Sequence, residues 1–174
     1  MSHDDGKKLD DIEKADIVLL GVSRTSKTPT SMYLANRGYK TANIPLVMDQ
    51  KIPDKLKSKN NKTCIIGLVT DPERLADVRR NRVTIMKENN IKEYTDLNVI
   101  KEEINTSRKL FKKYNWPIID VTRKSVEESA ASILKIFEIQ DVSPLTAVFI
   151  TLCFTLSFGW FQGWLIVKTG IASF

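Results

Sequence analysis

Eight consecutive residues carry the side chains best suited to chemistry on a phosphate group. They run from Gly21 to Thr28 and match the pattern G-x-x-x-x-G-K-[ST], except that Ser26 replaces the second Gly. A phosphate-binding loop needs main-chain N–H groups turned toward the anion, a Lys that reaches the outer phosphates and a hydroxyl for Mg²⁺. Gly is favoured at position 26 because of a backbone angle that Ser adopts at some cost. The predicted nucleotide-binding residues are Gly21, Val22, Ser23, Arg24, Thr25, Ser26, Lys27 and Thr28.

Within this loop, Lys27 is expected to stabilise charge on a transferred phosphoryl group and Thr28 to bind Mg²⁺. The alternative is a Ser- and Thr-rich turn with a solvated Lys. The context favours phosphate binding, because Ala15–Leu20 is a short branched apolar run typical of a buried strand. Pro29 lies in the first turn of a helix that continues over Ser31–Arg37 and ends at Gly38.

The remaining elements must position this loop. The apolar runs predict three further strands at Ala42–Val47, Cys64–Val69 and Trp116–Val121, and Pro117 places the last near a sheet edge or at the start of the strand. Helices are predicted from Asp71 to Met86, over Asp96–Tyr114 and over Ser125–Phe137, and Asp49–Lys62 is predicted as a surface loop. The side chains expected to face inward on these helices are Leu75, Val78, Val83, Met86, Ile100, Ile104, Leu110, Phe111, Val126, Ala130, Ile133 and Leu134. Ser125 and Glu128 form a predicted capping box. Alternating strands and helices predict an α/β fold with a largely parallel sheet.

Basic side chains outside the loop are further candidates for phosphate binding, because guanidinium groups make bidentate contacts with phosphate. Arg74, Arg79, Arg80 and Arg82 share one predicted helix, and Arg123 follows the last strand. Ligands of open α/β sheets lie beyond the carboxyl ends of the strands, where Gly21, Asp71 and Arg123 fall. The phosphate candidates are Arg74, Arg79, Arg82 and Arg123. The alternative is a solvated helix face paired with acids such as Asp77, and Arg24 has a similar solvated alternative.

His3, Asp4 and Asp5 form the only tight cluster of imidazole and carboxylate groups. A carboxylate there would orient a hydroxyl or a free phosphate, which makes the three residues catalytic candidates. The alternative is a frayed chain terminus without a role.

The composition divides the chain in two. It has 174 residues, 42% hydrophobic and 28% charged, which excludes disordered and fibrous classes. Residues 1–141 hold 26 Lys and Arg against 21 Asp and Glu, an excess that suits an anionic ligand but not a polybasic nucleic-acid arm. Two cysteines and one histidine exclude a Cys/His zinc cluster and a disulfide scaffold, and favour a reduced, cytoplasmic location. The N-terminal segment has no apolar core of the signal-peptide kind.

The last part of the chain is apolar. Leu145–Val167 is 23 residues long without a charge, and Lys168 follows it. As a helix it would be about 34 Å long, enough to cross a bilayer, with Trp160 and Trp164 near one end. Membrane contact through residues 145–167 is one interpretation, with the charged part left in the cytoplasm. The other is that the tail arose by a frame change or fusion and has no selected role.

The segment Ala15–Val47 resembles the nucleotide-binding segment of the regulatory proteins of pyruvate, phosphate dikinase and phosphoenolpyruvate synthase. The string GVSRTSKTP followed by SMYLA carries the resemblance, and HDDG at 3–6, Gly67-Leu68 with Asp71–Arg82, and IDVTRKSVEESAA at 119–131 match later motifs in order. The similarity covers residues 3–137. Family chains are longer at the N-terminus, so this chain is expected to correspond to an N-terminally truncated member.

The resemblance implies a fold similar to P-loop kinases and a bifunctional enzyme. It implies phosphorylation of a threonine of the dikinase with ADP as donor, and removal of that phosphate by inorganic phosphate with release of pyrophosphate. A nucleotide-binding module or a fragment without catalytic activity is the alternative. The expected organisation is a polar segment at residues 1–14, a nucleotide-binding domain at 15–138 and the apolar tail at 143–174, with no nucleic-acid partner.

Overall fold

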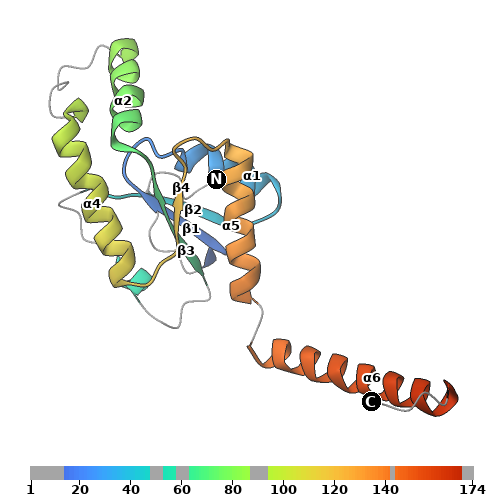
Figure 1. The fold of residues 1–174 in the computed structure, drawn as a ribbon. Coiled ribbons are helices and arrows are strands. Elements are labelled where there is room, and N and C mark those ends of the chain that lie inside the picture. The colour runs from blue at the N-terminus through green and yellow to red at the C-terminus, as the bar shows by residue number, and fades with distance from the viewer. Residues whose placement is uncertain (1–13, 48–52, 58–62, 87–93, 142–143, 170–174) are drawn as a thin grey trace. The chain divides into compact units, whose positions relative to one another are not determined.

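The computed structural model describes residues 14–47, 53–57, 63–86, 94–141 and 144–169. The chain divides into two compact units, Met1–Phe137 and Glu138–Phe174. The first unit is an α/β fold and the second consists of the end of one helix followed by another. Figure 1 traces both units by residue number.

Four parallel strands form the sheet of the first unit in the order β2-β1-β3-β4. They are β1 (Ile17–Gly21), β2 (Thr41–Pro45), β3 (Cys64–Val69) and β4 (Ile118–Asp120). Every residue of β1 and β3 is buried, as expected for central strands covered on both faces. The chain passes from β1 to β2 on one side and returns to β3 on the other, so the strand order reverses at β1. Ligand sites of open α/β sheets lie beyond such a reversal.

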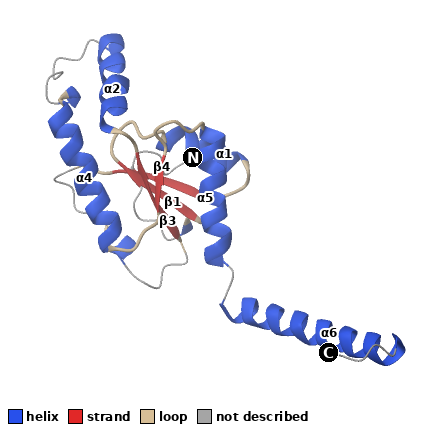
Figure 2. Cartoon of the chain, viewed as in Figure 1, coloured by secondary structure: helices blue, strands red, loops and turns tan. Residues whose placement is uncertain are grey.

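Helices cover both faces of the sheet, as Figure 2 shows. The helical elements are α1 (Lys27–Asn36), η3 (Asp54–Lys57), α2 (Pro72–Met86), α4 (Leu97–Lys113), α5 (Val126–Asp141) and α6 (Pro144–Thr169). On one face, Leu34 of α1 and Ile133 of α5 pack against Leu19 and Ile66. On the other face, α4 packs on the sheet through Phe111, and α2 packs on α4. The predicted α/β class is therefore confirmed.

Close approach of α4 to β3 depends on a glycine. A Cβ on Gly67 would lie 2.4 Å from the Phe111 ring, well inside van der Waals contact. Phe111 is fully buried there and also packs against Trp116. The missing side chain of Gly67 therefore makes room for the largest apolar residue of this core.

Several local predictions are confirmed by hydrogen bonds, by a backbone angle and by the strand order. In the capping box, the Glu128 carboxylate accepts from the Ser125 N–H at 3.0 Å, and the Ser125 hydroxyl accepts from the Glu128 N–H at 3.1 Å. The Asp96 carboxylate caps α4 by accepting from the Asn98 N–H at 2.7 Å. Gly38 ends α1 with a φ of +93°, an angle that favours glycine. Pro117 was predicted to mark a sheet edge or a strand start, and β4 both begins directly after it and lies at the edge of the sheet.

Other boundaries and faces differ from the prediction. β2 ends at Pro45 rather than Val47, α1 begins already at Lys27, and β4 covers only Ile118–Asp120. Val78 is 40% exposed rather than buried, because Ala76 and Arg79 take the inward face of α2. The side chain of Met86 lies outside the described residues.

The predicted surface loop between β2 and β3 also contains a buried anchor. In its described part, η3 places Leu56 in the core with 1% exposure. The loop is therefore not confined to the surface, because one apolar side chain ties it to the sheet face that α4 covers.

In the second unit, α6 is a continuous helix of 26 residues with Lys168 in its last turn. Of the residues that the structure describes, Val148–Lys168 is the one helical span long and apolar enough to cross a membrane by length and composition. Its described side chains are all exposed.

Candidate functional site

The loop between β1 and α1 has the backbone geometry of an anion-binding turn. Arg24 and Ser26 have φ angles of +73° and +55°, and α1 begins directly after Ser26. Alternation of left-handed and right-handed residues turns successive N–H groups toward one side, and a helix N-terminus adds positive partial charge there. Ser26 thus adopts the left-handed angle that glycine would take more easily.

Gly21 holds the beginning of the loop close to the neighbouring strand. A Cβ at this position would lie 2.7 Å from the Leu68 carbonyl oxygen and 2.8 Å from Thr25 Oγ1. Thr25 is itself buried and donates to the Val22 carbonyl oxygen at 3.0 Å. The loop is therefore packed tightly against β3, and the hydrogen bond between Thr25 and Val22 stabilises it internally.

Lys27 is directed across the loop and not into bulk water. Its side chain is 6% exposed, and Nζ donates to the Val22 carbonyl oxygen at 2.8 Å. The solvated lysine that the alternative interpretation requires is therefore absent from this structure. The ammonium group is therefore hydrogen-bonded to the backbone of the loop that carries it.

Thr28 has a partner that sequence reasoning missed. Nδ2 of Asn43, in the middle of β2, donates to Thr28 Oγ1 at 2.9 Å, and Asn43 is 1% exposed. Buried asparagine is uncommon in strands, so this polar residue between Ala42 and Ile44 was a usable signal. The contact fixes the hydroxyl predicted to bind Mg²⁺.

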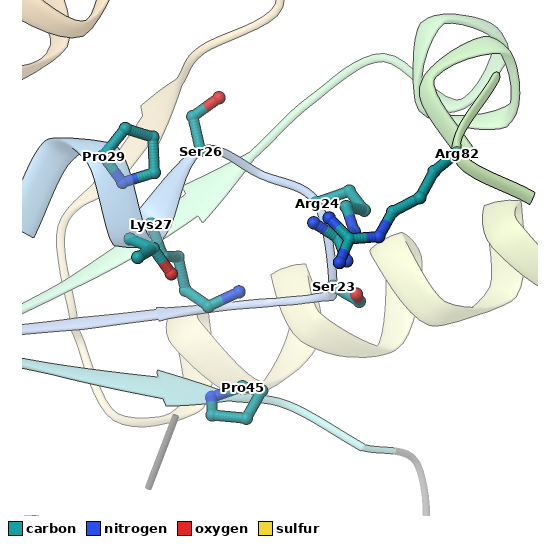
Figure 3. A pocket seen from close by; sticks show the side chains of 8 residues that line it. Ser23, Arg24, Ser26, Lys27, Pro29, Pro45 and Arg82 are labelled. Atoms are coloured by element: carbon teal, nitrogen blue, oxygen red, sulfur yellow. The ribbon is translucent and has the colours of Figure 1, made fainter. Parts of the chain in front are cut away.

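A pocket of about 630 Å³ opens beside the loop, beyond the carboxyl ends of β1 and β2. Its volume lies in the range of small-molecule sites. The lining residues are Ser23, Arg24, Ser26, Lys27, Thr28, Pro29, Pro45 and Arg82. Figure 3 shows Arg82 extending from α2 toward the part of the loop that carries Arg24. Three cationic side chains and no carboxylate line the pocket, so its electrostatics favour an anion.

The predicted arginine cluster on α2 separates into different environments. Arg82 lines the pocket. Arg80 is exposed and pairs with Asp77 at 3.4 Å, as the solvated alternative expects. Arg74 is exposed, and so is Arg123 in the turn after β4, and neither lines this pocket. These arginines have different environments because residues at successive positions of a helix point in different directions.

Arg79 is the most deeply buried cation of this cluster, with 1% exposure. Its guanidinium donates to the Glu103 carboxylate at 2.6 Å and to the Tyr94 carbonyl oxygen at 3.2 Å, and lies 3.5 Å from the Ser23 carbonyl oxygen. It also stacks over the Tyr94 ring at 4.5 Å. In this structure Arg79 therefore joins α2, α4 and the loop, rather than lining the pocket.

The loops after β3 and β4 are joined beside the site. The Asp71 N–H donates to Thr122 Oγ1 at 2.9 Å, and the Asp71 carboxylate caps α2 through the N–H groups of Glu73 and Arg74. Partial burial raises the pKa of Asp120, but hydrogen bonds from Thr122 and the nearby Arg108 outweigh it, so the pKa is lowered overall. Asp120 is therefore a carboxylate at neutral pH and not a proton donor.

Among the described residues, no group of three or more His, Cys, Asp and Glu is arranged to hold a metal ion. The Thr28 hydroxyl still fits a Mg²⁺ ion brought by a nucleotide, because Mg²⁺ takes most of its ligands from phosphate oxygens and water. His3, Asp4 and Asp5, predicted as catalytic candidates, lie outside the described residues.

Known proteins match this chain over its α/β unit. A family model described as kinase/pyrophosphorylase matches residues 1–134. A protein of Pelagibacter ubique (strain HTCC1062) is 61% identical over 139 residues, which are 80% of this chain and 51% of that protein. A Caulobacter vibrioides protein is 48% identical over 136 residues, 78% of this chain and 43% of that protein. Both bear the name "putative pyruvate, phosphate dikinase regulatory protein". The chain spans about half the length of these curated relatives.

Proposed function

Because the chain belongs to the kinase/pyrophosphorylase family, we propose that its loop after β1 binds the diphosphate of ADP for protein phosphorylation. The β-phosphoryl group of ADP is transferred to a threonine hydroxyl of pyruvate, phosphate dikinase or phosphoenolpyruvate synthase, and AMP leaves. In a second reaction, which reverses the modification, inorganic phosphate attacks the phosphothreonine, restores the hydroxyl and releases pyrophosphate. Both steps move one phosphoryl group between oxygen atoms.

One observation carries this proposal: the loop, a buried ammonium and two arginines meet at a single pocket without a carboxylate. Phosphoryl transfer depends mainly on positioning and on neutralising charge at the equatorial oxygens. In the proposed site the N–H groups of the loop hold the diphosphate. Lys27 lies beside the outer phosphate, and Arg24 and Arg82 contact oxygens on the open side.

A bound Mg²⁺ would neutralise the diphosphate further. In the proposal, Thr28 is its protein ligand, and Asn43 orients the Thr28 hydroxyl from β2. In keeping with the charged surface of the α/β unit, we place this unit in the cytoplasm.

The test uses the full chain and a purified dikinase. ADP labelled at the β-phosphorus should transfer label to the dikinase, and the labelled product should release pyrophosphate when inorganic phosphate is added. Arg82→Ala should lower the affinity for ADP about fivefold to tenfold, since one charged hydrogen bond is lost. Arg80→Ala is the matched control, because Arg80 lies two residues away on α2 and does not line the pocket.

The outcomes separate three possibilities. Transfer and phosphorolysis together support the proposal. Binding of ADP without transfer would reduce the chain to a nucleotide-binding module. No binding of ADP by a folded chain would overturn the proposal.

A further inference from the structure

Helix α6 is the largest feature that the proposed phosphoryl chemistry leaves unused. Between Leu145 and Val167 it carries no charge, and its described side chains are all exposed. Trp160 is 77% exposed and Val167 is 86% exposed. Exposed aromatic and aliphatic groups along a whole helix would be strongly unfavourable in water, so this helix requires an apolar environment.

The length of the helix matches the thickness of a bilayer. Its span Val148–Lys168 has 21 residues, which corresponds to about 32 Å at 1.5 Å per residue. The hydrocarbon core of a bilayer is about 30 Å thick. Core helices of soluble proteins and signal sequences can also be this long and apolar. The span is, however, not buried in the protein, and it follows the α/β unit along the chain.

The distribution of side chains around the helix points to lipid. Phe154 and Phe158 stack on one side of the helix, Leu156 lies on the opposite side, and all three are exposed. A helix that docks into a groove of a protein has one apolar face and one polar face. A helix that is apolar on every side, as here, fits a solvent of acyl chains that surrounds it.

Three hydroxyl groups of α6 are paired with carbonyl oxygens of the same helix. Thr151 Oγ1 donates to the Val148 carbonyl oxygen at 2.8 Å, and Ser157 Oγ donates to the Phe154 carbonyl oxygen at 2.8 Å. Thr155 Oγ1 donates to the Thr151 carbonyl oxygen at 3.0 Å. Hydroxyl groups in hydrocarbon have no water to bond, so such internal pairing removes most of their desolvation cost.

One end of the span carries a side-chain pair that is typical of a membrane interface. Lys168 Nζ lies 4.6 Å from the centre of the Trp164 ring. Tryptophan rings and long basic side chains lie at the level of the lipid headgroups, so this pair is expected where the helix leaves the hydrocarbon.

We propose that α6 spans a lipid bilayer and attaches the α/β unit to its surface, with Lys168 on the far side. This proposal is independent of the phosphoryl-transfer function. It concerns a different unit of the chain and rests on different contacts.

The experiment is insertion of the full chain into vesicles of phosphatidylcholine and phosphatidylglycerol during cell-free synthesis. Leu156→Lys combined with Phe158→Lys places two charges near the middle of the span, where each charge strongly opposes insertion. Ile139→Lys is the matched control, because Ile139 is an exposed apolar residue outside the span. The measured quantity is the fraction of chain that stays with floated vesicles after alkaline carbonate washing.

We expect the original chain and Ile139→Lys to resist the wash and the double variant to be retained at least tenfold less. Protease added outside the vesicles should digest the α/β unit and spare a tag after Phe174. Protection of the buried Cys64 from a thiol reagent before digestion reports that the α/β unit is folded in every variant. Release of the original chain by carbonate, equal retention of the double variant, or a soluble oligomer that shields α6 without lipid would each overturn the proposal.

Discussion

The loop after β1 and helix α6 are both formed by uncommon arrangements, but for opposite physical reasons. In the loop, a lysine is buried, a serine adopts a glycine-like angle and a glycine touches the next strand. In α6, the backbone is regular and the apolar side chains are exposed. A tightly packed polar loop is typical of a binding site, whereas a regular helix with exposed apolar side chains is typical of an apolar solvent.

Replacing a glycine by alanine is expected to change stability very differently in the two units, and this is the largest effect that we predict. Gly67→Ala should lower the free energy of unfolding of the α/β unit by about 2–3 kcal/mol, because the new methyl group overlaps the buried Phe111 ring. Gly159→Ala in α6 meets no atom within 4 Å and should raise helix stability by up to about 1 kcal/mol. Urea unfolding followed by the fluorescence of Trp116, with the tryptophans of α6 replaced by Phe, measures the first effect. Equal midpoints for Gly67→Ala and the parent chain would contradict the packing described here.

The reactivity of the two cysteines gives a second comparison of the two units, because each unit contains one of them. Burial raises the pKa of the Cys64 thiol to about 11, whereas Cys153 is exposed on α6. At pH 8 and without lipid, iodoacetamide should modify Cys153 more than about 100-fold faster than Cys64, since the thiolate is the nucleophile. Peptide mass spectrometry over time measures both rates. Similar rates in the folded chain would show that β3 is not protected.

The same thiol gives a pH dependence of stability. The folded state keeps Cys64 protonated to a higher pH than the unfolded state, whose thiol ionises near its usual pKa of about 8.5. The free energy of unfolding is therefore unaffected by this thiol below about pH 8.5 and falls as the pH rises toward 11, because only the unfolded state gives up the proton there. Cys64→Ala should flatten this part of the stability profile, and an unchanged slope would contradict the assignment.

Substitutions of two neighbouring arginines on α2 are expected to differ in their effect on stability, by less than the glycine substitutions do. Arg79→Met should destabilise the α/β unit by about 2 kcal/mol, because the Glu103 carboxylate and two carbonyl oxygens lose a charged donor. Arg80→Met removes an exposed ion pair with Asp77 and should cost less than about 0.5 kcal/mol. Thermal unfolding of both variants gives the comparison. A larger loss of stability for Arg80→Met than for Arg79→Met would contradict the structure, in which Arg79 is buried and Arg80 is exposed.

Ser26→Gly is expected to have the smallest effect. Glycine relieves the positive φ at this position but adds entropy to the unfolded chain, so stability should change by less than about 1 kcal/mol. Calorimetry of the variant measures it. A loss greater than 2 kcal/mol would mean that the Ser26 side chain has a role beyond its backbone angle.

The sequence predicted those parts of the fold that depend on neighbouring residues. The bounds of β3, the capping box at Ser125 and the glycine end of α1 each follow from short patterns, and all three are confirmed. The order of strand, loop and helix around Lys27 is confirmed for the same reason.

What depends on contacts across the fold was not predictable from one sequence. The contact between Asn43 and Thr28 requires knowing that β2 lies beside β1. The burial of Arg79 depends on where α4 packs, and a helical periodicity that counts only apolar residues placed Val78 inward instead. Arg82 could be named as a phosphate candidate, but only the pocket distinguishes it from Arg74 and Arg80.

We propose that the loop after β1 binds a diphosphate, with Lys27 beside the outer phosphate. Calorimetric titration of ADP with Mg²⁺ into the full chain tests this binding, with Lys27→Ala and the exposed-site control Lys109→Ala in parallel. We expect saturable binding of one ADP by the original chain and by Lys109→Ala, and an affinity about 30- to 100-fold weaker in Lys27→Ala. Absence of heat with a folded original chain, or equal affinity in Lys27→Ala, would contradict it.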